Sequence, residues 1–341
     1  MWTRRAGRHP LRRPETCEVS RAASQTERSI DAFVDRLAER ADQALAVPDD
    51  VLHLSLAGRD VRVRVGGRGL VELVRPALRH ALVAGADPSL TIDAWDRAAT
   101  GVAPPPPVWD QDDLLGSGVV RGQVNDRYTI TYDTWMRMLT VYDRLRSRAF
   151  VHVADVAEVP DWVRRSPLRN PISWWAADAG VAVLHAGTVC DGDAAVAITG
   201  ASGSGKSTTT LACVDAGMGF LGDDACMVRF EPGAIASPMF GLGKLEVGDG
   251  GQQVIDLTHR TVASAPLRAV LVVSVAAQQH TSVEALSPTQ AFRALVEGSL
   301  DEGAGTALAG LRRVATEVAC YRVLLGSDRS GVVAAVREVA R

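Results

Sequence analysis

The stretch of sequence that decides the fold is Gly200-Ala201-Ser202-Gly203-Ser204-Gly205-Lys206-Ser207, and Thr208 follows it. It satisfies the Walker A pattern GxxxxGK[ST] at every defined position. The apolar run 194–198 precedes it, and residues 206–216 favour a helix. A strand, a glycine-rich turn and a helix in this order are the context in which the pattern binds phosphate. The alternative is a turn rich in glycine and serine that joins a strand to a helix by chance.

The residue types in this stretch suit a phosphate site. Glycines let the backbone curl so that successive N–H groups and the N-terminus of the following helix face one anion. Lys206 would reach the β- and γ-phosphates, and the Ser207 hydroxyl would ligate Mg²⁺. Lys206 is also one of only two lysines among 37 Lys and Arg residues, and Arg does not replace a compact ammonium at every site. Residues 200–208 are therefore predicted to bind a nucleotide.

An acidic pair, Asp223-Asp224, follows the helix after the loop. Residues 219–229 are predicted to form one strand that returns toward the phosphates. Because neighbouring side chains on a strand point to opposite faces, we expect one carboxylate to address the reacting atoms and the other to meet metal or supporting groups. A solvated acidic turn is the alternative, although apolar neighbours make an unpaired carboxylate costly there.

Further residues around the loop and the acidic pair give the sequence a family resemblance. They are Leu184-His185-Ala186 and Ala216-Gly217-Met218-Gly219-Phe220-Leu221-Gly222. Together they resemble the catalytic domain of the bacterial HPr kinase/phosphorylase family, which implies a P-loop fold related to phosphoenolpyruvate carboxykinases. The resemblance also implies phosphorylation of a serine hydroxyl with ATP and Mg²⁺. It places His185, Lys206 and the Asp223/Asp224 pair in the catalytic set, with one Asp as general base. Ser207 and Asp224 are the predicted metal ligands.

Two of the candidates have structural alternatives. His185 falls in a helix predicted from Ile172 to Ala186, where a purely structural histidine is the other interpretation. Lys244 belongs to the segment 237–245, which is similar to one that follows the Asp pair in divergent relatives. It would contact a phosphate or the substrate, or else be a surface lysine. Trp174 and Trp175 are predicted to be core residues rather than a platform for base stacking.

The chain also departs from the family pattern. Ala201 and Thr208 stand where the family usually has Asp and Glu, and a later glycine- and isoleucine-rich signature has no counterpart. The resemblance therefore does not extend to the phosphorylase reaction or to HPr as the acceptor. A GTPase would need an NKxD or TKxD element, and a transporter ATPase would need an LSGGQ-type signature. Neither is present.

Two regions and an extension are predicted: an α+β region over 29–165, a P-loop kinase-like α/β region over 166–341, and an Arg-rich extension over 1–28. We expect the extension to be disordered, with an organellar transit peptide as the alternative. Four prolines at 104–107 predict an extended linker or surface loop. A helix from 29 to about 45 is predicted from apolar residues at helical spacing, which are Ile30, Phe33, Val34, Leu37 and Ala41.

Composition excludes several other classes. The net charge of -3 argues against a nucleic-acid partner, and no apolar run is long enough to span a membrane. Five scattered cysteines without a CxxC pair indicate reduced thiols and a cytoplasmic protein. The predicted function is a phosphotransferase with a protein or peptide acceptor, and homo-oligomers are left open. A small-molecule kinase and a non-catalytic nucleotide-binding regulator are the alternatives.

Overall fold

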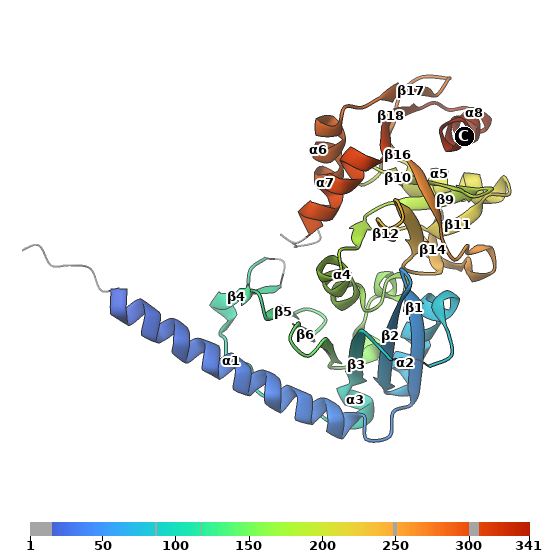
Figure 1. The fold of residues 1–341 in the computed structure, drawn as a ribbon. Coiled ribbons are helices and arrows are strands. Elements are labelled where there is room, and N and C mark those ends of the chain that lie inside the picture. Colours follow the sequence, from blue (N-terminus) through green and yellow to red (C-terminus); the bar gives the residue numbers. More distant parts are fainter. Residues whose placement is uncertain (1–15, 86, 117, 248–250, 300–306) are drawn as a thin grey trace, which may run out of the picture.

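The computed structural model describes residues 16–85, 87–116, 118–247, 251–299 and 307–341, which form a mixed α/β fold on two large sheets (Figure 1). The first sheet has seven strands in the order β1-β2-β3-β7-β6-β5-β4. The elements of this half are α1 (Thr16–Ala44), β1 (Asp50–Leu56), β2 (Arg59–Gly66), α2 (Arg68–Leu78), β3 (Leu90–Asp96), α3 (Arg97–Thr100), β4 (Val119–Val124), β5 (Tyr128–Asp133), β6 (Met138–Asp143) and β7 (Arg148–Val153).

The second sheet has nine strands, and its main path runs β11-β9-β10-β16-β13-β12-β8. β18 pairs with β16 and with β17, and β14 and β15 form a separate hairpin. The elements of this half are α4 (Arg169–Asp178), β8 (Ala182–Leu184), β9 (Gly187–Asp191), β10 (Ala194–Thr199), α5 (Lys206–Asp215), β11 (Gly219–Gly222), β12 (Cys226–Arg229), β13 (Ile235–Pro238), β14 (Leu242–Val247), β15 (Gly251–Asp256), β16 (Ala265–Val275), β17 (Ser282–Ala285), α6 (Pro288–Ser299), α7 (Ala307–Glu317), β18 (Ala319–Leu325) and α8 (Arg329–Ala340).

Helix α1 covers one face of the seven-stranded sheet. Its five apolar residues at helical spacing are each at most 3% exposed, which confirms the predicted buried face. They pack against Trp95 of β3 and Phe150 of β7. The helix begins at Thr16 and so includes residues 16–28, for which the sequence predicted disorder. No Gly or Pro interrupts these residues, so the helix continues toward the N-terminus. The rest of the predicted extension, residues 1–15, lies outside the described residues.

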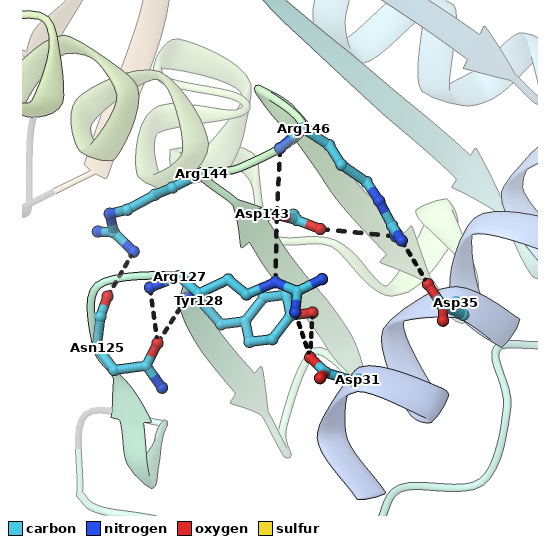
Figure 2. Close-up of polar contacts among 8 residues, drawn as sticks. All are labelled: Asp31, Asp35, Asn125, Arg127, Tyr128, Asp143, Arg144 and Arg146. Carbon is cyan, nitrogen blue, oxygen red and sulfur yellow. Dashed lines mark hydrogen bonds and ion pairs between the residues drawn. The ribbon is translucent and has the colours of Figure 1, made fainter. Parts of the chain in front are cut away.

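Ion pairs also connect α1 to this sheet (Figure 2). The guanidinium of Arg127 lies 2.8 Å from the carboxylate of Asp31. The Arg146 guanidinium lies between two carboxylates, 2.7 Å from that of Asp35 on α1 and 3.6 Å from that of Asp143 on β6. The Asp143 side chain is fully buried, and a buried carboxylate needs such compensation. Ion pairs and apolar packing therefore both hold α1 against this sheet.

The opposite face of the seven-stranded sheet packs against α2 and α4. Trp174 and Trp175 of α4 are 6% and 4% exposed, which confirms that they are core residues. One apolar cluster contains them together with Leu54 of β1, Met239 and Leu242. This cluster includes residues from both sides of position 165, so the two sheets share a core.

Two predicted elements are wrong, and glycine is the cause in each. The helix predicted over 172–186 ends at Asp178, because Gly180 adopts a φ of 74° and its N–H bonds back to the Ala177 carbonyl. The strand predicted over 219–229 is two strands, because Gly222 turns the chain with a φ of 146°. Within the described part of the chain, no helix has the length and apolar character needed to cross a membrane.

Candidate functional site

The glycine-rich loop 200–205 joins the end of β10 to the start of α5. β10 is an inner strand, antiparallel to β9 and parallel to β16. Gly203 and Gly205 have φ values of 74° and 96°, and a Cβ on Gly200 would lie 2.5 Å from the carbonyl oxygen of Val273. These positions therefore require glycine. Gly205 also provides no side chain to cap α5, so the first N–H groups of this helix can serve an anion.

The side chain of Lys206 folds back over this loop. Its Nζ donates hydrogen bonds to the carbonyl oxygens of Gly200, at 2.8 Å, and Ala201, at 3.0 Å. Burial lowers the pKa of Lys206 and the ammonium of Lys244 lowers it further, while the acidic pair acts in the opposite direction. Two ammonium groups that disfavour each other create a place where an anion would be stabilised.

Asp223 follows β11 and is only 3% exposed. Its Oδ2 accepts a hydrogen bond from the backbone N–H of Lys244 at 2.9 Å. Its Oδ1 has no hydrogen-bond partner among the residues that the structure describes. Burial raises the pKa of the Asp223 carboxyl, and the Lys244 N–H and the Ser207 hydroxyl reduce this rise. The Ser207 hydroxyl lies near enough to act on this carboxylate without meeting the geometry of a hydrogen bond to Oδ1, so Oδ1 retains the capacity to bind another group.

Asp224 forms an ion pair with Arg169, the first residue of α4. Nη1 of Arg169 lies 2.6 Å from Oδ2 of Asp224, and Nη2 donates to the main-chain carbonyl of Asp224 at 3.3 Å. Burial raises the pKa of Asp224, but the charge of Arg169 and of other basic neighbours outweighs it, so the pKa lies below its usual value. Asp224 is therefore ionised at neutral pH, whereas the environment of Asp223 disfavours its charge.

His185 lies directly after β8 instead of in the predicted helix. Its Nδ1 is 3.7 Å from Oδ1 of Asp224 and 3.2 Å from Nη2 of Arg169. Its main-chain carbonyl accepts a hydrogen bond from the Thr199 hydroxyl at 3.0 Å, which fixes it beside the end of β10. His185, Arg169 and Asp224 thus form one polar cluster.

A cavity of about 640 Å³ lies over the loop and the first turn of α5. All the residues that the sequence predicts for the site line this cavity except Ser204 and Asp223. Ser204 is buried within the loop. Lys244 lies on β14, is half-buried and lines the cavity. Lys244 is therefore in a strand and not in a loop, while its contact with phosphate or substrate stays a prediction.

The residues of this site fit a magnesium ion only together with phosphate. In the described ranges, no group of three or more His, Cys, Asp or Glu residues is placed to hold a metal. Mg²⁺ commonly uses one or two carboxylates and completes its shell with phosphate oxygens and water. Ser207 and the free Oδ1 of Asp223 provide such a partial set. Asp224, which the sequence assigned to the metal, has Oδ2 occupied by Arg169.

The sequence did not identify every residue of the site. Arg169 lies 55 positions before Asp224, and no local pattern connects the two. The nearby Pro171 marks only the start of a helix. Glu297 and Gly298 of α6 and the stretch 325–327 complete the cavity wall. Those residues come from a distant part of the chain, so only the fold brings them to the loop.

Comparisons with solved structures found matches to this chain, among them one distant likeness. No family model matches the chain, and no curated protein matches it. A solved structure that matches is the Hpr(Ser) kinase/phosphatase from Coxiella burnetii, with 16% sequence identity and a TM-score of 0.29. The match covers 46% of this chain and 88% of that chain. A likeness of this size indicates at most a distant relationship.

Proposed function

We propose that this chain is an ATP- and Mg²⁺-dependent kinase that transfers the γ-phosphate to a hydroxyl group, the serine of a protein or peptide. The observation that carries the proposal is the cavity of about 640 Å³ that gathers Lys206, Ser207, Asp224 and Lys244 over the glycine-rich loop. Its volume lies in the usual range for small-molecule sites. In this proposal, residues 200–208 are a P-loop.

The positive charge for the triphosphate comes from three sources. Lys206 exchanges its bonds to the Gly200 and Ala201 carbonyls for bonds to phosphate oxygens. Lys244 adds a second ammonium at the cavity wall, and the N-terminus of α5 adds N–H groups. Ser207 and Asp223 are the proposed magnesium ligands. When bound there, Mg²⁺ neutralises charge on the phosphates during transfer.

Asp224 is the better placed general base of the pair. It lines the cavity and its pKa is lowered, so it is ionised and accessible. As the acceptor oxygen bonds to the γ-phosphorus and the bond to the β-phosphate oxygen breaks, the hydroxyl proton passes to the Asp224 carboxylate. Arg169 and His185 hold this carboxylate in position.

The test is the double substitution Asp223→Asn with Asp224→Asn. We expect ATP binding to stay measurable by calorimetry. Transfer of radiolabelled phosphate to a panel of serine peptides should fall by at least roughly a hundredfold. Asp215→Asn is the matched control, since Asp215 is exposed at the end of α5. Normal transfer by the double variant would show that the mechanism is wrong, and transfer only to small alcohols would favour a small-molecule kinase.

One observation favours a second candidate, a nucleotide-binding regulator without transfer activity. The ion pair between Arg169 and Asp224 stabilises the charged carboxylate and so weakens it as a base. Such a regulator would bind ATP through Lys206 and would transfer phosphate to no member of the acceptor panel. The double variant would then bind ATP like the wild type and show no other difference.

A further inference from the structure

A second cavity, of about 210 Å³, lies against the seven-stranded sheet. It shares no lining residue with the cavity over the loop. Its floor is formed by residues of β5, β6 and β7, among them Leu139 and His152. Its other walls are Phe33 of α1 and the proline-rich segment 104–109. The run of prolines that the sequence predicted as a linker or surface loop therefore closes a cavity.

The His152 ring in this wall meets Trp95 edge to face but makes no hydrogen bond to the described residues. It is 5% exposed, and neither ring nitrogen has a hydrogen-bond partner among the described residues. Burial, and then the charge of Arg97, lower the pKa of His152 to about 4, so the ring is neutral at physiological pH. A neutral imidazole offers one donor and one acceptor. Leaving both unused in a buried site is costly, and a ligand in the cavity would satisfy them.

The charge at the cavity favours an anion. Arg97, at the start of α3, lines the cavity and makes no ion pair within the described ranges. Arg137 also lines it, but its guanidinium is paired with Glu158. Arg97 is exposed and has no carboxylate partner among the described residues, and a guanidinium binds a carboxylate with two parallel hydrogen bonds.

The remaining walls suit a flat apolar group. Trp109 and Phe33 meet edge to face, with ring centroids 4.9 Å apart. Pro105 is buried beside them, and a proline ring presents a rigid apolar surface without a free N–H. A largely apolar cavity with a few convergent polar groups is the usual form of a small-molecule site.

We propose that this cavity binds a small aryl carboxylate. The ring lies between the proline-rich segment and the sheet, and the carboxylate faces Arg97 and His152. The size of the cavity favours one ring with a short acidic group over a longer chain. This site is independent of the proposed kinase activity, because no residue is common to the two cavities.

The test measures binding to the full chain by calorimetry and thermal shift, with benzoate as the probe. Benzamide removes the charge and acetate removes the ring, and we expect both to bind at least tenfold more weakly than benzoate. Arg97→Gln should weaken benzoate binding at least tenfold. The control Arg121→Gln changes an exposed arginine of β4 outside the cavity and should leave binding unchanged.

His152→Phe separates a binding role from a structural one. If the role of His152 were purely structural, this variant would still bind benzoate, whereas the proposal requires that benzoate binding be lost. Replacing an unpartnered imidazole with a ring of similar shape should not lower the melting temperature. Equal binding of benzoate by wild type, Arg97→Gln and His152→Phe would overturn the proposal, as would no binding at all. If a peptide ending in phenylalanine bound as tightly as benzoate, the proposal that the occupant is a free small molecule would be wrong.

Discussion

The backbone N–H of Lys244 donates a hydrogen bond to the carboxylate of Asp223, with 2.9 Å between the nitrogen and Oδ2. The bond uses the main chain of Lys244, so the ammonium of this residue remains available to the cavity. The buried carboxylate and the second lysine are therefore positioned together, although 21 residues separate them.

Lys244→Ala tests this division between main chain and side chain. The bond to Asp223 persists in the variant, so the free energy of unfolding should change by less than about 0.5 kcal/mol. Phosphate transfer should fall roughly tenfold to a hundredfold, because a charge aimed at the phosphates is lost. Urea unfolding and a transfer assay measure the two effects. Lys244→Arg keeps the charge and should retain more activity than the alanine variant; equal activity of all three proteins would contradict the assignment.

Lys206→Met removes the ammonium group and should weaken the binding of ATP. We expect the dissociation constant for ATP to rise at least tenfold, which corresponds to about 1.4 kcal/mol. Calorimetry measures it directly. Lys206→Arg is the informative companion, since a broad guanidinium does not fit where Nζ now meets the Gly200 and Ala201 carbonyls. ATP affinity of wild-type strength in both variants would remove Lys206 from the site.

Arg169→Gln should change the pH dependence of transfer. The charge of Arg169 lowers the pKa of Asp224, while burial raises it. Without that charge the pKa of Asp224 rises, so the carboxylate loses its proton only at higher pH. The acidic limb of kcat/KM against pH should therefore move toward higher pH. A limb that stays in place would show that Asp224 is not the base.

His152 should make the folded chain sensitive to acid. The pKa of this histidine is about 4 in the folded chain, against 6.5 for the free side chain. Between these values the unfolded chain binds a proton that the folded chain does not, so stability falls as the pH falls. The loss from this group is about 3 kcal/mol once the pH is below 4. Urea unfolding at several pH values should show a smaller loss for His152→Phe than for wild type; identical losses would contradict the prediction.

Local sequence signals predicted the parts of the fold that depend on neighbouring residues. The loop at 200–205 follows a strand and precedes a helix because its glycines and the apolar run fix the chain locally. The buried face of α1 follows from helical spacing alone. The bond from Lys244 to Asp223 could not be predicted, because it depends on how β14 lies beside the end of β11.

Two of the errors share a physical cause, which is backbone geometry at glycine. Gly180 and Gly222 each sit within an apolar run, and periodicity gives no sign that either adopts a positive φ. His185 was therefore assigned to a helix and reached the site from a strand end instead. Arg169 and the cavity at His152 depend on contacts between distant segments, which no single stretch of sequence contains.

Because the two sheets share a core, a ligand bound at one sheet should stabilise the other as well. Leu54, Trp175 and Met239 belong to one apolar cluster, so neither sheet can open without exposing surface of the other. Calorimetry should therefore record the two sheets unfolding in one transition. A nucleotide bound at the loop would then raise the melting temperature of every element at once, α1 included, by mass action on one folded state.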